Sequence, residues 1–189
     1  MEHFSNDIKS SIKVLLNGGI ILYPTDTIWG IGCDATNAAA VKKIYQLKKR
    51  EEKKTLIILV SNENEIRNYV LNPSQKIMDF ISIQKTPTTA IFEKAMHFPK
   101  EIINEDGSVA IRIVKDDFCV SLIHQLKRPL VSTSANISGQ PSPQNFKQVN
   151  VAIKNGVDFI VQHRQNEIIN YRQSSIFKLN SLNEIEKIR

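Results

Sequence analysis

The chain has 189 residues, of which 41% are hydrophobic and 23% charged, an ordinary globular composition that excludes disordered and fibrous classes. Its length predicts one domain over residues 1–189. With 25 Lys and Arg against 19 Asp and Glu, the net charge is +6. That charge indicates either an anionic partner, such as a nucleotide or a nucleic acid, or simply a lysine-rich surface.

Membrane and metal classes are not favoured by the sequence. No apolar run reaches the ~18 residues that a membrane span needs, and the N-terminus lacks the pattern of a secretory signal. Cys33 and Cys119 are far apart, and the four histidines are scattered. We therefore expect free thiols, no metal site built by the protein, no membrane partner and a cytoplasmic location.

The spacing of apolar residues predicts alternating helices and strands. In chain order it predicts a helix at 8–16, a strand at 20–23, a helix at 40–47, a strand at 56–60, helices at 66–70 and 77–81, strands at 88–92 and 108–114, a helix at 118–126, and strands at 129–133, 157–161, 174–179 and 184–188. Ser5 or Asn6 is expected to cap the first helix and Asn37 the second, and Ser142-Pro143 has the form of another helix start. This interleaving indicates the α/β class, with a mixed sheet.

A hydroxyl-rich segment, Tyr23-Pro24-Thr25-Asp26-Thr27, follows the first strand. It is either a ligand-binding loop or a turn in which Asp26 bonds its own backbone. The residues at 30–35 also fit the dinucleotide motif G-x-G-x-x-A. We discount this match, because the first glycine does not follow the strand directly.

A basic stretch, Lys48-Lys49-Arg50-Glu51-Glu52-Lys53-Lys54, ends the second helix. The helix dipole alone favours cations there by ~0.3–1 kcal/mol. On a helix, however, Lys48 and Arg50 diverge. We therefore expect one end of the stretch to be a loop that presents both cations to the same anion, as a polyphosphate site requires.

The third unusual segment runs over 129–139, where an apolar strand leads into five hydroxyl or amide side chains within seven residues. Helix capping accounts for one or two of them, and small polar residues allow backbone N–H groups to approach a phosphate. Arg112 lies in the middle of a predicted strand. If its face is buried it needs an anionic partner, and if its face is solvated it carries no functional meaning.

Together these segments resemble the YrdC/TsaC family of threonylcarbamoyl-AMP synthases, in its compact single-domain form. The motifs are Tyr-Pro-Thr-Asp-Thr, Lys-x-Arg and Ser-Thr-Ser-Ala-Asn-x-Ser-Gly, in this order. The resemblance implies a twisted sheet with a concave basic face. It also implies the synthesis of threonylcarbamoyl-AMP and pyrophosphate from ATP, L-threonine and bicarbonate. The product would pass to partner proteins that modify tRNA next to the anticodon, and Mg²⁺ is expected to be bound through ATP.

The resemblance also implies the site residues. The candidate catalytic residues are Lys48, Arg50, Ser134 and Asn136. The candidate ATP-binding residues are Arg50, Lys54, Ser108, Ser134, Ser142 and Arg189. The candidate threonine-binding residues are Thr27, Arg112, Ser132 and Ser174. Leu59 departs from the family pattern, since longer members of the family carry a threonine-contacting histidine there, and the segment around Ser174 follows the pattern only loosely.

Two other functions remain open at this point. One is a binding module that holds tRNA or double-stranded RNA on a basic surface without catalysis, although aromatic residues are only 7% of the chain. The other is a paralogue that keeps the nucleotide site and acts on another amino acid.

Overall fold

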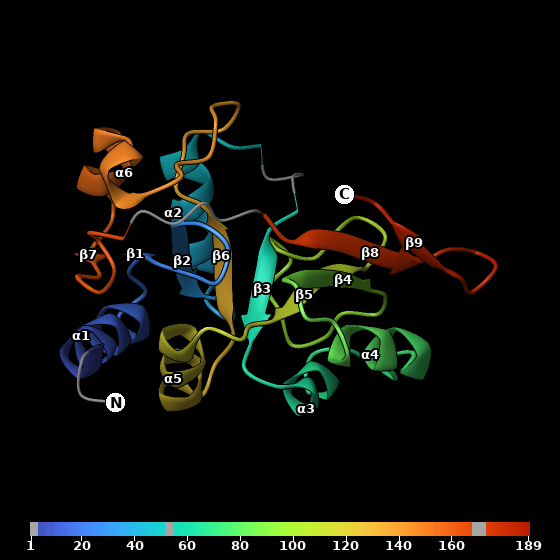
Figure 1. The fold of residues 1–189 in the computed structure, drawn as a ribbon. Coiled ribbons are helices and arrows are strands. Elements are labelled where there is room, and N and C mark those ends of the chain that lie inside the picture. Colours follow the sequence, from blue (N-terminus) through green and yellow to red (C-terminus); the bar gives the residue numbers. More distant parts are fainter. Residues whose placement is uncertain (1–3, 52–54, 168–172) are drawn as a thin grey trace.

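The computed structural model describes residues 4–51, 55–167 and 173–189. Its helices are α1 (Ser5–Leu16), α2 (Ala38–Lys48), α3 (Glu63–Arg67), α4 (Gln75–Ser82), α5 (Asp117–Leu126), the 3₁₀ turn η2 (Phe146–Gln148) and α6 (Val151–Gly156). Its strands are β1 (Ile21–Tyr23), β2 (Gly30–Asp34), β3 (Ile57–Val60), β4 (Thr88–Phe92), β5 (Val109–Ile113), β6 (Leu130–Ser134), β7 (Phe159–Ile160), β8 (Ser175–Leu179) and β9 (Ile185–Lys187). The α/β class is confirmed (Figure 1).

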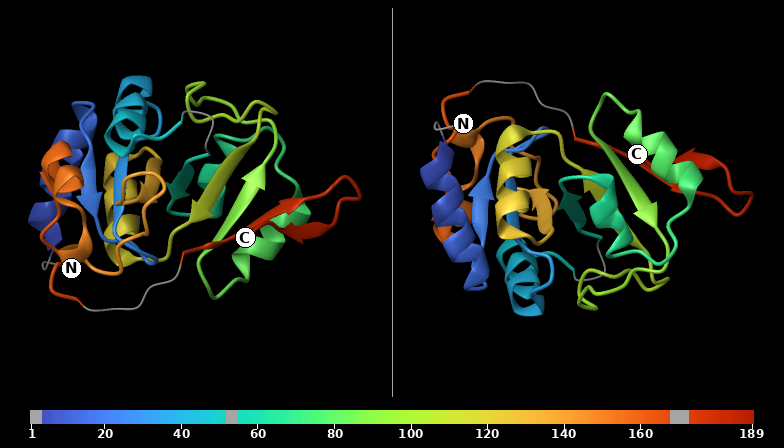
Figure 2. Two further views of the ribbon diagram at one scale, coloured as in Figure 1. Left: turned by 90° about the horizontal axis from the view of Figure 1, so that it is seen from above. Right: turned by 90° about the horizontal axis from the view of Figure 1, so that it is seen from below.

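One mixed sheet connects all nine strands in the order β7-β1-β2-β6-β3-β5-β4-β8-β9. The pairs β1·β7, β3·β5 and β4·β8 are parallel, and the remaining pairs are antiparallel. Figure 2 shows the β8–β9 hairpin projecting at one end of this sheet, away from α1 and β7. No described helix is long and apolar enough to cross a membrane.

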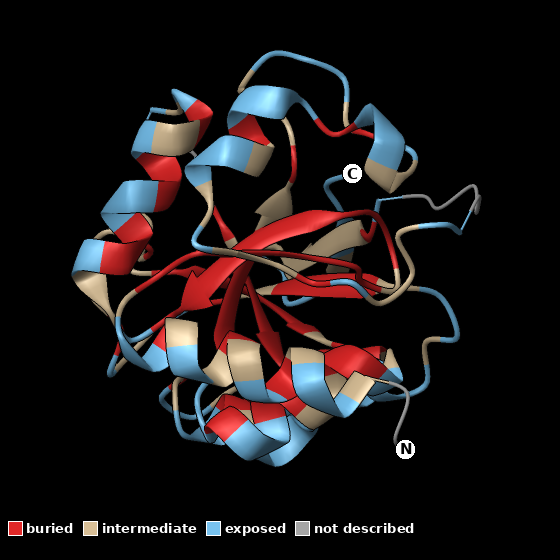
Figure 3. Cartoon of the chain, turned by 90° about the vertical axis from the view of Figure 1, so that its left-hand side faces the viewer, coloured by how far each residue is buried: buried red, intermediate tan, exposed pale blue. Residues whose placement is uncertain are grey.

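Alternation along the strands divides the buried residues between two apolar layers. In β3, Ile58 and Val60 join the layer that also contains residues of α2, α3, α4 and α6, whereas Leu59 joins the layer built with α1 and α5. This split is the period-2 pattern of a strand buried on both faces. Figure 3 shows the buried side of each helix turned toward the sheet and its exposed side turned outward.

Helix ends show which capping predictions are correct. Asn37 caps α2, accepting a hydrogen bond from the N–H of Ala40 at 3.1 Å, as predicted. The cap predicted for α1 is wrong, because Ser5 is already helical and no side chain caps that end. No helix starts at Ser142-Pro143 either. Asn145 and Asn150 instead cap η2 and α6, since their side chains accept the free N–H groups of those turns.

Strand β2 is the main element that sequence reasoning missed, because glycine is depleted in strands. Gly30 and Gly32 are nevertheless both in β2, which pairs with β1 and β6. A Cβ on Gly32 would lie 2.7 Å from the Tyr23 ring, so only glycine fits that close approach. The glycines therefore belong to a strand rather than to a dinucleotide-binding turn, and β1 and β2 hold the 24–29 loop between them.

Candidate functional site

A cavity of about 290 Å³ opens over the part of the sheet formed by β6, β3, β5, β4 and β8. Its floor follows from strand register: Ile57 of β3 pairs with Ser132 of β6 and with Ala110 of β5, and Ala110 pairs with Ile91 of β4. Residues paired in register share one face of a sheet, so these four form a row beneath the cavity. Sequence reasoning named Ser132 but missed the three apolar residues of this row, Ile57, Ala110 and Ile91, because they read as ordinary core strands.

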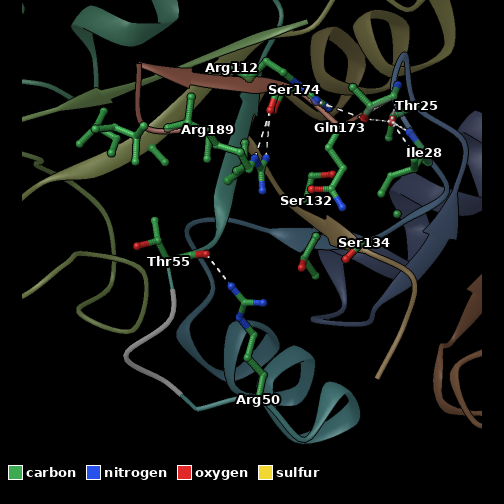
Figure 4. Close-up of a pocket in the computed structure, with 18 residues that line it drawn as sticks. Thr25, Ile28, Arg50, Thr55, Arg112, Ser132, Ser134, Gln173, Ser174 and Arg189 are labelled. Atoms are coloured by element: carbon green, nitrogen blue, oxygen red, sulfur yellow. Dashed lines mark hydrogen bonds between the residues drawn. The ribbon is translucent and has the colours of Figure 1, made fainter. Parts of the chain in front are cut away.

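The polar part of the lining is rich in cations and hydroxyl groups. Figure 4 shows Arg50 and Arg112 reaching the cavity from opposite sides, with Arg189 between them. The hydroxyl residues of the lining are Thr25, Thr27, Thr55, Ser132, Thr133, Ser134 and Ser174. Of the described residues that line the cavity, none is Asp or Glu. Such a lining favours a ligand that carries several negative groups.

The 24–29 loop is organised by the hydroxyl group of Thr25. Its oxygen accepts the N–H groups of Thr27 at 3.0 Å and Ile28 at 3.2 Å, and the hydroxyl donates to the Ile28 carbonyl at 2.8 Å. The Asp26 side chain takes no part in these hydrogen bonds of the loop. It forms an ion pair with Arg112 instead. Of the two alternatives for this segment, the turn in which Asp26 bonds its own backbone is therefore not the one formed, and Thr25 and Thr27 both line the cavity.

The side chain of Arg112 connects the 24–29 loop to strand β5. Its side chain is 4% exposed, with Nη2 3.2 Å from Asp26 Oδ1. Its Nη1 donates to Thr27 Oγ1 at 3.2 Å. Its Nε, which is also buried, has no hydrogen-bond partner among the described residues. The face of Arg112 is therefore buried and its anionic partner is Asp26, which leaves donor capacity beside the cavity.

Arg189 and Ser174 form another part of the cavity wall. Arg189 donates from Nε and Nη2 to the Ser174 carbonyl at 3.3 and 3.1 Å, and the Ser174 hydroxyl shares a 2.8 Å hydrogen bond with Thr89. Burial and the charge of Arg112 lower the pKa of Arg189. Gln173, which sequence reasoning missed, lines the cavity and donates to Ser142 Oγ at 3.0 Å.

The Lys-x-Arg pair separates at the end of α2. Helix α2 ends at Lys48, and Lys49 adopts a left-handed conformation with φ 49°. Arg50 then lines the cavity and donates to the Thr55 carbonyl at 2.9 Å (Figure 4). Lys48 instead is 1% exposed and hydrogen-bonds the carbonyl groups of Ser134 and Asn136. The expected loop is present, but it does not bring both cations to the cavity.

Ser108 and Ser142, also predicted to bind ATP, lie near the cavity but not in its lining. Ser108 accepts from Asn104 Nδ2 at 2.9 Å, and Asn104 Oδ1 accepts from Thr55 at 2.7 Å, so Ser108 is two hydrogen bonds from a lining residue. Among the described residues, Ser142 is hydrogen-bonded to the lining through Gln173. Lys54 lies outside the described residues.

Asn136 does not line the cavity, and its amide nitrogen donates to the carbonyls of Ile137 at 3.0 Å and Gln140 at 2.6 Å. The N–H groups of Ala135, Asn136 and Ser138 also bond within the protein. The segment after β6 therefore does not offer these three N–H groups to a phosphate. Leu59, fully buried beside Arg112 in register, packs in the apolar layer of α1 and α5.

The buried side chain of Lys48 should make the free energy of unfolding depend on pH. Burial, followed by the charge of Arg50, lowers the pKa of Lys48 from 10.5 to about 7. Between pH 7 and pH 10.5, Lys48 is more protonated in the unfolded chain than in the folded protein. The free energy of unfolding therefore rises with pH in this window. We expect the free energy of unfolding of wild type minus that of Lys48→Met to increase over this window, by at most about 1.4 kcal/mol per pH unit. Urea titrations from pH 6.5 to 9.5 would measure it, and a constant difference would contradict the prediction.

Comparison with known proteins identifies similar chains. The model of the Sua5_yciO_yrdC family, described as "Telomere recombination", matches residues 13–189. The threonylcarbamoyl-AMP synthase of Xanthomonas euvesicatoria pv. vesicatoria is 30% identical over 159 residues, which cover 82% of this chain and 84% of that protein. The threonylcarbamoyl-AMP synthase of Pseudoalteromonas translucida is 34% identical over 136 residues, covering 70% and 73%.

Among solved structures, P. abyssi Sua5 complexed with L-threonine matches with a TM-score of 0.85 at 23% identity, covering 96% of this chain and 53% of that one. This chain thus spans about half the length of that structure. The likeness shows that the two share a fold.

Proposed function

The chain belongs to the Sua5/YciO/YrdC family, and we propose that it is a threonylcarbamoyl-AMP synthase. Its substrates would be ATP, L-threonine and bicarbonate, and its products threonylcarbamoyl-AMP and pyrophosphate. Relatives named for this activity match most of their own length. The activity also suits a small domain whose cavity holds fixed cations and hydroxyl groups.

The observation that carries the proposal is the lining of the cavity. Three guanidinium groups and seven hydroxyl residues surround it, together with an apolar floor. A nucleoside triphosphate and an amino acid supply matching groups: phosphates and a carboxylate for the cations, and a flat base for the apolar residues.

We assign the two halves of the polar lining to the two substrates. Arg50 and Ser134 would contact the phosphates. Arg112 and Thr27 would hold the carboxylate of threonine, since both line the cavity and the Arg112 guanidinium, whose Nη1 donates to Thr27 Oγ1, carries further N–H groups. The remaining assignments are Ser132 and Ser174 for threonine, and Lys54, Ser108, Ser142 and Arg189 for the nucleotide.

The proposed chemistry needs no protein nucleophile. The amine of threonine attacks the carbon of bicarbonate, forms a carbamate and releases water. A carbamate oxygen then attacks the α-phosphorus of ATP, and the bond to the β-phosphate breaks to release pyrophosphate. The main barriers are the assembly of three reactants and the approach of one anion to another. Positioning supplies up to ~7–11 kcal/mol toward this, and fixed cations stabilise the charge that develops on the phosphates.

Mg²⁺ is proposed to arrive bound to ATP. Among residues 4–51, 55–167 and 173–189, no group of three or more His, Cys, Asp or Glu side chains could hold a metal ion. The hydroxyl-rich lining fits a Mg²⁺ that keeps several waters and is held by substrate phosphates. When bound, the ion would neutralise part of the phosphate charge.

The product would pass to proteins that transfer the threonylcarbamoyl group to tRNA, a reaction we place in the cytoplasm. The net charge of +6 is also suited to contact with tRNA or double-stranded RNA. RNA binding of this kind would accompany the synthase activity.

Pyrophosphate release tests the proposal. The protein is incubated with ATP in four reactions, with and without L-threonine and with and without bicarbonate. We expect release only when both are present. Release with a different amino acid would indicate a paralogue. No release, together with RNA binding that weakens with salt regardless of ATP, would indicate a binding module and contradict the synthase assignment.

A further inference from the structure

Lys48 joins the end of α2 to the last residue of β6 and the residues that follow it, a segment that we call the 134–138 loop. Its Nζ donates to the carbonyl oxygen of Asn136 at 2.7 Å and also contacts that of Ser134. Its own carbonyl accepts the N–H of Ser138 at 2.8 Å. One residue thus connects the helix to three positions of the loop.

The ammonium group has little capacity left for a ligand. A lysine ammonium has three donors, and two of them point to backbone carbonyl groups. The side chain is among the largest fully buried ones in the protein, and Lys48 is not among the residues that line the cavity. The left-handed conformation of Lys49 explains this placement. It turns the chain so that Arg50 lines the cavity, while Lys48 stays buried behind the residues that line it.

Within the 134–138 loop, Ser134 is the residue that lines the cavity. Other polar groups of the loop bond internally: Ala135 N–H donates to the Trp29 carbonyl at 3.0 Å, and Asn136 N–H donates to the Ser134 carbonyl at 2.9 Å. The carbonyl that Lys48 contacts belongs to the residue whose hydroxyl is available for a ligand. Displacing Lys48 would therefore displace Ser134.

We propose that Lys48 is a positioning residue, which fixes the 134–138 loop from behind the cavity wall and orients Ser134, without contacting the substrate phosphates. The importance of Ser134 for catalysis rests on the proposed function. The bracing of the loop by Lys48 does not, and it is measured separately below.

A double-mutant cycle on catalysis tests the action through Ser134. Lys48→Met removes the donors but keeps an unbranched apolar stem, and Ser134→Ala removes the hydroxyl. If Lys48 acts through Ser134, we expect each single variant to lose about tenfold or more in kcat/KM for ATP, and the double variant to be within about twofold of the worse single variant. Multiplied losses in the double variant would mean an independent contact and would overturn the proposal.

Hydrogen exchange without any ligand tests the bracing itself. In the free protein, Lys48→Met is expected to raise the exchange rate of the amides at 135–140 by about tenfold or more, because the loop loses its anchor. Lys43→Met is the matched control, since Lys43 is an exposed lysine of the same helix that contacts the Gly18 carbonyl. It should leave this loop unchanged. Exchange in Lys48→Met equal to wild type would overturn the proposal, even if the chain releases no pyrophosphate.

Reductive methylation of the wild-type protein gives a second test if Lys48→Met does not fold. Lys48 is expected to remain unmodified both with and without ATP, because it is buried in both states, whereas Lys43 is modified in both. Modification of Lys48 in the free protein, with protection by ATP, would place it on the phosphates and refute the positioning role.

Discussion

Arg50→Ala is expected to lower kcat/KM for ATP by about 10²–10³-fold while the protein remains folded. The reason is that the variant loses a fixed cation that stabilises the negative charge developing on the phosphates. Arg50 lines the cavity on the side opposite Arg112, and its guanidinium is held by the Thr55 carbonyl. Pyrophosphate release at varied ATP measures the loss, and circular dichroism verifies the fold. Near-normal turnover would remove the phosphate-binding role of Arg50.

Two further variants define what Arg50 contributes. Arg50→Lys keeps a cation but loses the planar fork, so we expect it to recover only part of the activity. Arg67→Ala, on the exposed face of α3, removes the same charge far from the cavity and should retain wild-type kinetics. Equal losses in Arg67→Ala and Arg50→Ala would indicate a general effect of net charge instead of a contact in the cavity.

The helices and most strands could be predicted because their signals are local. Apolar spacing and the Asn37 cap define α2, and continuous apolar runs define β1 and β3. Strand β2 could not be predicted in this way. Gly30 lies against Ser132 Oγ and Gly32 against the Tyr23 ring, and only the folded chain brings these groups near the two glycines. Tertiary contacts override propensity there.

The candidate site likewise contains residues that the sequence could predict and residues that it could not. Polar residues that break an apolar pattern, such as Arg112 and Ser134, are visible in the sequence and line the cavity. Whether a polar residue faces the cavity or braces its wall depends on the chain direction after it, and for Lys48 this is set by the left-handed Lys49. The floor residues Ile57 and Ile91 carried no signal, since only the strand register shows that they share the cavity face with Ser132 and Ala110.

Arg112→Met is expected to raise KM for L-threonine by about 10–150-fold with KM for ATP nearly unchanged, the size of effect that follows from losing hydrogen bonds to a charged group. The reason is geometric. Nη1 and Nη2 are engaged by Thr27 and Asp26, while Nε has no hydrogen-bond partner among the described residues. These contacts account for one N–H of each Nη nitrogen, so they would fix the guanidinium and leave the second N–H of each Nη for the substrate carboxylate. Pyrophosphate release at varied threonine and saturating ATP measures it.

Loss of Arg112 also affects stability, and this must be separated from binding. The Asp26 side chain is 15% exposed and would lose its cationic partner, a loss that costs about 3–5 kcal/mol in buried ion pairs. The double variant Asp26→Asn/Arg112→Met removes both charges, so its melting temperature should return toward that of wild type. Its KM for threonine should remain high. If the double variant recovers threonine affinity together with stability, Arg112 is a structural partner of Asp26 alone, and the carboxylate of threonine binds elsewhere in the cavity.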